Sequence, residues 1–137
     1  MRNRGSAVLI DWENQNIALI KRNREGIIYY VFPGGGMEEG ETPEEATIRE
    51  AYEELGVKIE IKDLIGIVEF NGTQYFYLAE MNDGKFGTGI GEEFTNQKRN
   101  RGTYEPVWLS LKDCLSKDIR PREVIDELLK KHILKKA

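Results

Sequence analysis

The stretch from residue 35 to residue 57, GGMEEGETPEEATIREAYEELGV, constrains this chain more than any other. It follows a glycine-rich turn with a segment that carries Glu50, Glu53 and Glu54 close together. Crowded carboxylates repel one another unless a cation neutralises them. A hard divalent cation such as Mg²⁺ takes oxygen ligands, and it often binds through a few carboxylates together with substrate phosphates. The stretch therefore indicates metal-assisted chemistry on phosphate groups.

The glutamate-rich segment is predicted to be a helix with well-defined ends. Thr42 is an N-cap residue, Pro43 suits the first helical position, and Glu45 completes a capping box with Thr42. Gly56 is a natural C-terminal stop. An apolar stripe at helical spacing is expected to face the core, made of Ile48, Ala51, Tyr52 and Leu55.

The opposite face of this helix is expected to present oxygen atoms to a cleft. Glu50 and Glu54 lie one turn apart on it, with Ala46 and Glu53 beside them. Arg49 lies one turn from both Glu45 and Glu53, so it can pair with an acidic neighbour and orient it.

The stretch resembles the Nudix box, which runs Gly, five residues, Glu, seven residues, then Arg-Glu-U-x-Glu-Glu-x-Gly-U, where U is a bulky apolar residue. The matching positions are Gly35, Glu41, Arg49, Glu50, Glu53, Glu54, Gly56 and Val57. Ala51 is smaller than the usual residue at the first U, a departure that affects packing and removes no chemical group. A solvated acidic helix would explain the charges, but it would not explain the glycine turn and the full register.

The resemblance implies hydrolysis of a nucleoside diphosphate linked to a further group X, assisted by Mg²⁺ with Mn²⁺ as a substitute. It implies Glu50 and Glu54 as metal ligands, and Glu53 as a ligand or as the base that takes a proton from water. It further implies that the carbonyl of Gly34 completes the metal shell and that Arg49 orients the glutamates. The box residues with a structural role would be Gly35, Glu41 and Gly56.

Family members often add a carboxylate from the loop before the last strand, and Glu93, next to Glu92, is the preferred candidate here. Possible substrate contacts are Arg22 and Arg24 for phosphate, with Phe32 and Tyr75 for a base. Each has an ordinary alternative. A cationic side chain at the end of a strand is often simply exposed to solvent, and aromatic residues that alternate along a strand often belong to the core. The basic cluster Lys98, Arg99 and Arg101 is expected to be a solvated loop surface.

The expected secondary structure is a set of strands with two main helices. Strands are predicted over residues 6–11, 16–21, 27–32, 57–61, 64–70, 73–81 and 106–109, with Lys62-Asp63 interrupting one pair and a loop at residues 34–36. A C-terminal helix opens at Pro121, with a buried stripe of Val124, Ile125, Leu128, Leu129 and Ile133. This order indicates an α/β (α+β) fold with a sheet between helices. The resemblance implies the same architecture, an α/β/α sandwich with a mixed β-sheet.

Length and charge limit the other possibilities. A chain of 137 residues suits one domain, here residues 1–137. The net charge of −4 argues against a nucleic-acid polymer or an anionic membrane as partner. Cys114 is the only cysteine, so no internal disulfide forms, and the N-terminus has too little apolar sequence for a signal peptide. A cytoplasmic protein is the default expectation, and a homodimer stays open.

The leading functional prediction is a mutator-type nucleoside triphosphate pyrophosphohydrolase that releases a nucleoside monophosphate and pyrophosphate. Its substrates would include oxidised nucleotides such as 8-oxo-dGTP. Other small-molecule substrates stay open, namely dinucleoside polyphosphates, for which Tyr75 is a weak family marker, and ADP-ribose. An alternative of another class is a nucleotide-binding regulatory module without turnover, against which the intact Glu50, Glu53 and Glu54 argue.

Overall fold

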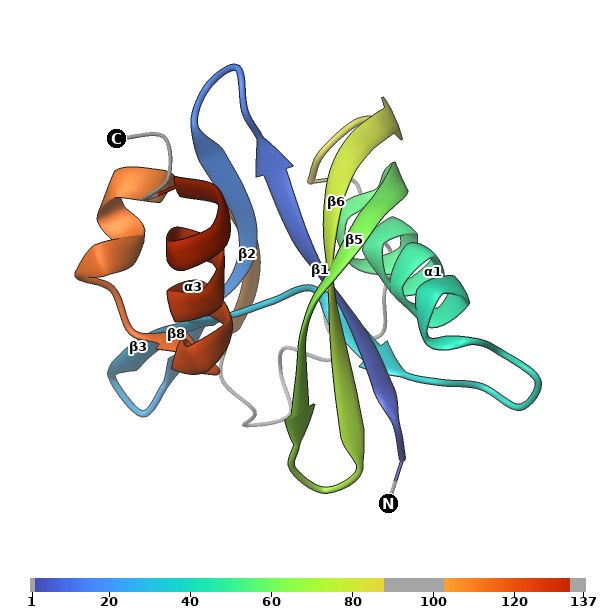
Figure 1. The fold of residues 1–137 in the computed structure, drawn as a ribbon. Coiled ribbons are helices and arrows are strands. Elements are labelled where there is room, and N and C mark those ends of the chain that lie inside the picture. The colour runs from blue at the N-terminus through green and yellow to red at the C-terminus, as the bar shows by residue number, and fades with distance from the viewer. Residues whose placement is uncertain (1, 88–102, 134–137) are drawn as a thin grey trace.

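A curled mixed sheet forms the centre of the protein in the computed structural model, which describes residues 2–87 and 103–133, with side chains through Lys131 (Figure 1). The strands are β1 (Arg4–Asp11), β2 (Asn16–Arg24), β3 (Ile27–Val31), β4 (Gly34–Gly36), β5 (Val57–Glu69), β6 (Thr73–Gly84), β7 (Thr103–Ser110) and β8 (Ile119–Arg120). The main order is β5-β6-β1-β2-β3-β8, with β4 paired to β1 and β7 paired to β2. The β1–β6 and β3–β8 pairs are parallel and the other pairs are antiparallel.

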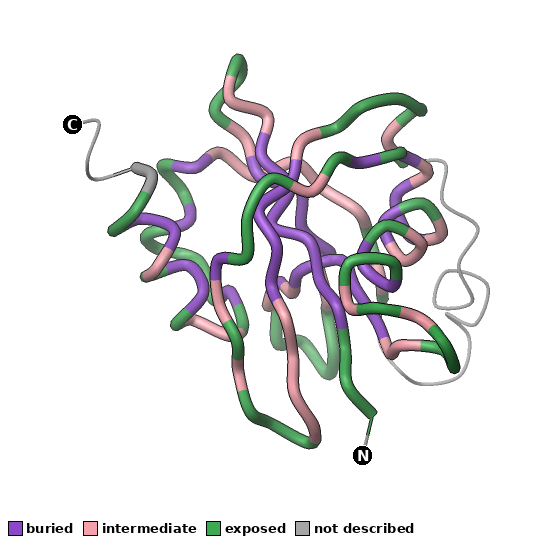
Figure 2. Tube along the Cα trace, turned by 45° about the vertical axis from the view of Figure 1, so that its right-hand side comes forward, coloured by how far each residue is buried: buried purple, intermediate pink, exposed green. Residues whose placement is uncertain are grey.

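The two central strands are buried on both faces, because helices cover both sides of the sheet. Along β1, Val8 and Ile10 join one apolar cluster, whereas Ala7 and Leu9 join the other. Strand β2 alternates in the same way. Figure 2 shows this buried centre running through the middle of the molecule. Two-sided burial explains why β1 and β2 read as nearly continuous apolar runs.

One helix lies on each face, and this confirms the predicted α/β/α arrangement (Figure 1). Helix α1 (Pro43–Leu55) packs on one cluster through Ala51 and Leu55. The other cluster is covered by α3 (Arg122–Leu128), which continues as a π-helical turn over Leu129–Ile133, and by the 3₁₀ helix η1 (Leu111–Leu115). The predicted C-terminal stripe is confirmed for Val124, Ile125, Leu128 and Leu129, while the side chain of Ile133 lies outside the described residues.

Three features of the sheet differ from the sequence-based expectation. Lys62-Asp63 does not interrupt the chain, because β5 is one strand whose register with β6 shifts between Ile61 and Asp63 and at two other points. The glycines at residues 34–36 do not form a loop, since they pair with Arg4–Ser6 as β4. Strand β8, only two residues long, was not anticipated.

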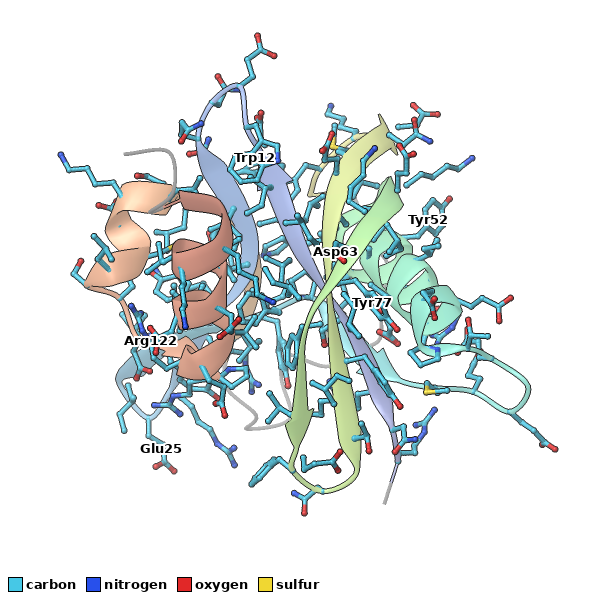
Figure 3. All side chains as sticks on the ribbon, in the orientation of Figure 1. Trp12, Glu25, Tyr52, Asp63, Tyr77 and Arg122 are labelled. Carbon is cyan, nitrogen blue, oxygen red and sulfur yellow. The ribbon has the colours of Figure 1, made fainter. Side chains whose placement is uncertain are left out.

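The ends of α1 follow the prediction, but its buried face does not. Both hydrogen bonds of the capping box are present, and Gly56 ends the helix in the left-handed conformation, with φ of 79°. Ile48 and Tyr52 are exposed, and Figure 3 shows Tyr52 on the outer side of α1. The buried residues of α1 are Ala46, Thr47, Ala51, Glu54 and Leu55. The helix is therefore rotated so that the side carrying Glu54 faces inward.

Candidate active site

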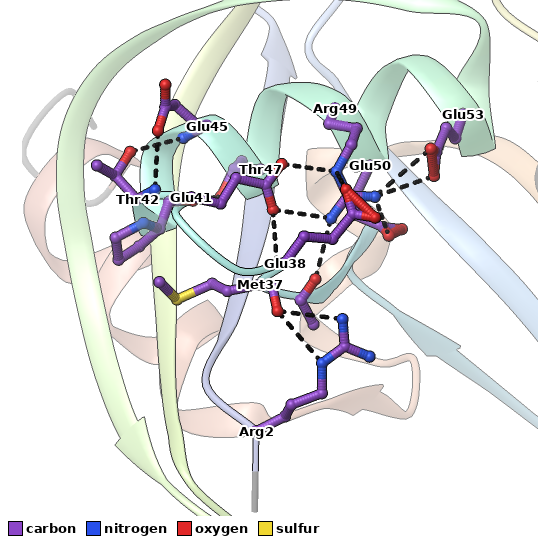
Figure 4. Close-up of polar contacts among 12 residues, drawn as sticks. Arg2, Met37, Glu38, Glu41, Thr42, Glu45, Thr47, Arg49, Glu50 and Glu53 are labelled. Atoms are coloured by element: carbon purple, nitrogen blue, oxygen red, sulfur yellow. Dashed lines mark hydrogen bonds and ion pairs between the residues drawn. The ribbon is translucent and has the colours of Figure 1, made fainter.

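Arg49 organises the carboxylates of the box (Figure 4). Its Nε and Nη2 atoms donate to the two carboxylate oxygens of Glu41 at 2.7 and 3.0 Å. Its Nη1 atom donates to Glu50 at 3.0 Å and to Glu53 at 3.1 Å. Its Nη2 atom also donates to the carbonyl oxygen of Gly36 at 3.0 Å. A planar guanidinium with a fork of donors suits this task, since it holds several acceptors at fixed angles.

Glu41 connects this network to the loop before the helix. Its Oε1 atom also accepts from the backbone N–H of Glu38 at 2.8 Å, while Glu38 itself lies 3.2 Å from Arg49 Nε. The hydrogen bond from Arg49 holds the pKa of the Glu41 carboxyl below its usual value. The same pairing, first with Glu41 and then with Glu50, raises the pKa of Arg49, so both partners stay charged. The structure agrees with a bracing position for Glu41, and its role stays a prediction.

Glu54 is the buried carboxylate of the site, with 4% of its surface exposed. Its Oε1 atom accepts a hydrogen bond of 2.8 Å from the backbone N–H of Gly34. A buried carboxylate is tolerated only when such donors replace water. The bond therefore fixes the end of α1 against β4.

Gly35 lets the backbone approach the helix closely. A Cβ atom placed on Gly35 would lie 2.5 Å from the carboxylate of Glu50. Only a residue without a side chain therefore leaves Glu50 where it is. The absence of a side chain at Gly35 is therefore needed for the observed position of Glu50.

A cleft of about 690 Å³ begins at the contact between Gly34 and Glu54. Its polar lining includes Gly34 and Glu54 at the box end, with Arg4, Arg22, Arg120 and Gln74. Its apolar lining includes Phe32, Phe76, Val68 and Phe70. Phe32 and Phe76 meet edge to face with ring centroids 5.5 Å apart, while Phe70 is 65% exposed. The cleft is large enough for a small-molecule ligand and combines cations with aromatic rings.

Two of the predicted substrate contacts lie on this cleft and two do not. Arg22 and Phe32 line it, and their contact with substrate stays a prediction. Arg24 is exposed and lies outside the lining. Tyr75 lies on the other face of β6, where its ring stacks on Tyr77 at 6.5 Å, and Tyr77 in turn donates to Glu44 of α1, as Figure 3 shows for Tyr77 beside that helix. Alternation along β6 thus places Tyr75 away from the cleft.

The predicted extra carboxylate lies outside the described residues, as does the predicted basic cluster. These are Glu92, Glu93, Lys98, Arg99 and Arg101. Conversely, the structure adds Arg4, Tyr29 and Arg120, none of which the sequence had marked. No periodic pattern or motif surrounds them, and only the pairing of β3 with β8 brings Arg120 near β2 and β3.

The box residues fit a divalent metal by donor type, since Glu50, Glu53 and Glu54 and the Gly34 carbonyl all offer oxygen. Among residues 2–87 and 103–133, however, no three His, Cys, Asp or Glu side chains converge into a ready-made metal site. Glu50 and Glu53 contact Arg49 instead. A bound ion would therefore compete with Arg49 for these two carboxylates.

Comparison with known proteins identifies the family of this chain. The family model of the Nudix domain matches residues 1–128 of the chain. The chain belongs to the Nudix family. The resemblance carried by the box is thereby confirmed, and in this chain the Gly34–Glu54 contact joins the box to the cleft.

Individual relatives agree with this Nudix assignment. A putative 8-oxo-dGTP diphosphatase of Bacillus subtilis is 31% identical over 88 residues, covering 62% of this chain and 58% of the relative. Diphosphoinositol polyphosphate phosphohydrolase 3-alpha of Mus musculus is 50% identical over 42 residues, covering 31% of this chain and 26% of the relative. The chain thus spans about a quarter to somewhat over half the length of these curated relatives.

Solved structures show the same fold. A MutT structure, from work on the Aliivibrio salmonicida and Vibrio cholerae proteins, superposes with a TM-score of 0.70. It covers 95% of this chain and 97% of the other at 17% identity, so the likeness concerns the Nudix fold alone. Of the helices in the described part of the chain, none is long and apolar enough to cross a membrane.

Proposed function

We propose that this chain is a pyrophosphohydrolase that cleaves a phosphoanhydride bond in a nucleoside diphosphate linked to X. The observation that carries the proposal is the contact between Glu54 and Gly34, which joins the box carboxylates to the wall of the cleft. A nucleotide in this cleft has aromatic surface for its base and carboxylates at the end where its phosphates meet the box. We further propose that residues 1–137 form one domain acting on small molecules.

The substrate that we favour is a nucleoside triphosphate, which would yield a nucleoside monophosphate and pyrophosphate. Phe32, Phe70 and Phe76 offer apolar surface on which a base can stack. The Bacillus subtilis relative, named for 8-oxo-dGTP, supports including oxidised nucleotides in this class.

Glu53 is the proposed general base. Its side chain is 41% exposed, whereas those of Glu41 and Glu50 are 15% and 12% exposed. Arg49 holds one of its oxygens at 3.1 Å, which restricts its orientation and leaves it accessible to water. An accessible, oriented carboxylate can take a proton from an attacking water.

Glu50, Glu54 and the Gly34 carbonyl would hold Mg²⁺, which would neutralise charge on the phosphate oxygens and activate water. Arg49 then acts as a positioning residue, because it contacts the glutamates and does not line the cleft. Arg4, which lines the cleft, supplies positive charge to these phosphates.

The test is a hydrolysis screen with Mg²⁺, run with and without a chelator, in which the products are separated by ion-exchange chromatography. The panel holds canonical and oxidised nucleoside triphosphates, ADP-ribose, NADH and diadenosine polyphosphates. We expect one class to be hydrolysed and its hydrolysis to stop with the chelator. No hydrolysis of any of these substrates would favour a nucleotide-binding module without turnover.

The variant Glu53→Gln separates the enzyme from that binding module. We expect kcat to fall by about 10²–10⁴-fold while nucleotide binding persists, since the substitution removes a base and keeps the shape. Glu60→Gln is the matched control, because Glu60 is an exposed carboxylate on β5 that pairs with Lys62. Equal turnover by Glu53→Gln and the wild type would refute the assigned role of Glu53.

A further inference from the structure

Two arginines of the cleft lining contact one tyrosine ring. The guanidinium carbon of Arg120 lies 4.1 Å from the ring centroid of Tyr29, and that of Arg22 lies 5.7 Å from it. Arg22 also lies 3.7 Å from the ring centroid of Tyr104. Both arginines line the cleft.

Strand pairing explains why these four side chains meet. Arg22 of β2 stands directly opposite Tyr29 of β3 and Tyr104 of β7. Strand β8 pairs with β3 in parallel and brings Arg120 to the same group. The arrangement is therefore built by four strands and is preorganised before any ligand binds.

Stacking determines which atoms of these arginines face other partners. A guanidinium stacked on a ring uses its face, so its N–H groups, which lie in its plane, are left for hydrogen bonds. The Nε and Nη2 atoms of Arg120 donate hydrogen bonds to the carboxylate of Asp118, at 3.1 and 2.8 Å. In the described part of the chain its Nη1 atom has no hydrogen bond.

Two acidic residues line the same cleft and would weaken the attraction of the arginines for an anion. Glu69 lines it, and its carboxylate accepts from the hydroxyl of Thr73. Glu123 lines it as an exposed residue three positions after Arg120. Glu123 should therefore oppose binding of an anion at the two arginines.

We propose that Arg22 and Arg120 form a second anion subsite, which binds a phosphate group additional to the diphosphate that is hydrolysed. The proposal rests on the proposed function for the orientation of the substrate. It makes the substrate class a nucleotide that carries a further phosphomonoester or a polyphosphate chain. Tyr29 precedes Gly34 by five residues, and five extended residues span at most about 18 Å. One small molecule with phosphates at both ends can bridge this distance.

The kinetic test compares substrates that differ by a single phosphomonoester. NADP⁺ is compared with NAD⁺, and coenzyme A with its 3′-dephospho form. For the pair that is hydrolysed, we expect kcat/KM to favour the phosphorylated member by about tenfold or more, as expected for a charge-assisted contact.

Variants on the subsite should change this ratio in opposite directions. Arg120→Gln should bring it close to one, and Arg120→Lys should restore part of it, because lysine keeps the charge and loses the planar fork. Glu123→Gln should raise it. Lys117→Gln removes an equal charge near β8, outside the cleft lining, and should leave the ratio unchanged.

A binding measurement keeps this proposal separate from the proposed function. Inorganic tripolyphosphate is titrated into the wild type and the variants by calorimetry, with a chelator present and no substrate. Weaker binding by Arg120→Gln supports the subsite even where no substrate is turned over. Equal ratios for both members of a pair, with tripolyphosphate binding unchanged in Arg120→Gln, would overturn the subsite while the hydrolase assignment stands. Should Arg120→Gln fail to fold, Glu123→Gln decides, because an unchanged ratio and unchanged binding there also refute the subsite.

Discussion

The backbone N–H of Gly34 donates a hydrogen bond of 2.8 Å to the Oε1 atom of Glu54. It joins β4 to the last turn of α1, and Glu54 is 4% exposed there. An unsatisfied buried charge would cost more than the roughly 1–3 kcal/mol of an unmade neutral hydrogen bond. The bond therefore makes the position of β4 depend on Glu54, a carboxylate of the proposed active site. The same residue thus serves both the fold and the proposed function.

Replacing Arg49 by lysine tests whether the guanidinium fork orders the box. Lysine keeps the charge but cannot serve Glu41, Glu50 and Glu53 together. We expect Arg49→Lys to lose about 1–3 kcal/mol of unfolding free energy and to lower kcat/KM by about 100-fold through misplaced carboxylates. Urea unfolding and steady-state kinetics measure the two effects. Arg24→Lys, at an exposed strand end, should keep stability within about 0.5 kcal/mol, and an equally small effect at Arg49 would contradict the network.

Adding one methyl group at Gly35 should disturb activity more than folding. The new Cβ would lie 2.5 Å from the carboxylate of Glu50, which ends a flexible side chain and can move aside. We expect Gly35→Ala to fold normally and to lose about 10- to 100-fold in kcat. Circular dichroism and kinetics check this.

Gly36→Ala is the matched control for that experiment. Its Cβ would instead crowd the guanidinium of Arg2, 2.6 Å away. Arg2 binds the carbonyl of Met37 and does not line the cleft (Figure 4). A loss in Gly36→Ala as large as that in Gly35→Ala would show that general crowding, and not displacement of Glu50, is responsible.

The Glu41–Arg49 contact predicts a pH dependence of stability on the acid side. The hydrogen bond from Arg49 holds the folded-state pKa of Glu41 below its ordinary value of 4.5. A lowered carboxyl pKa contributes stability above the unfolded-state pKa, and that contribution is lost as pH falls through the folded-state pKa. Denaturant unfolding from pH 6 downward should therefore show a loss of stability that is smaller in Glu41→Gln. Parallel curves for the two proteins would rule out this contribution.

Cys114 should react slowly in the folded protein. Its side chain is 1% exposed, and burial raises the pKa of its thiol to about 11. The thiolate is the reactive form, so both its population and its access are low at neutral pH. We expect alkylation by iodoacetamide at pH 8, followed by mass spectrometry, to be at least about 100-fold slower than in urea. Comparable rates in the two conditions would mean that the thiol is accessible in the native state.

Local rules were enough to predict α1 and the two central strands. The capping box of Thr42 and Glu45 and the stop at Gly56 act within one turn of the chain, so the bounds of α1 needed no tertiary information. The same rules were not enough for the buried face of the helix. Ile48 and Tyr52 continue an apolar period, but they are exposed, because α1 packs inward through the side that carries Ala51, Glu54 and Leu55.

Tertiary pairing also decided which candidate contacts share the cleft. Alternation along β6 predicted that Tyr75 and Phe76 face opposite sides, but the positions of the helices and the cleft assigned those sides, so Phe76 lines the cleft and Tyr75 does not. The register shifts of β5 likewise absorb Lys62-Asp63, which sequence rules interpret as a break.

The sequence by itself determined the family, the capped helix and the residues of the box, because each depends on residue types at short, fixed spacings. Only the tertiary structure decided that Arg49 binds Glu41, Glu50 and Glu53 together, and that Arg120 joins Arg22 on Tyr29. The arginine pair lies nearly one hundred positions apart in the chain. Its proximity follows from a two-residue strand pairing that no local pattern encodes.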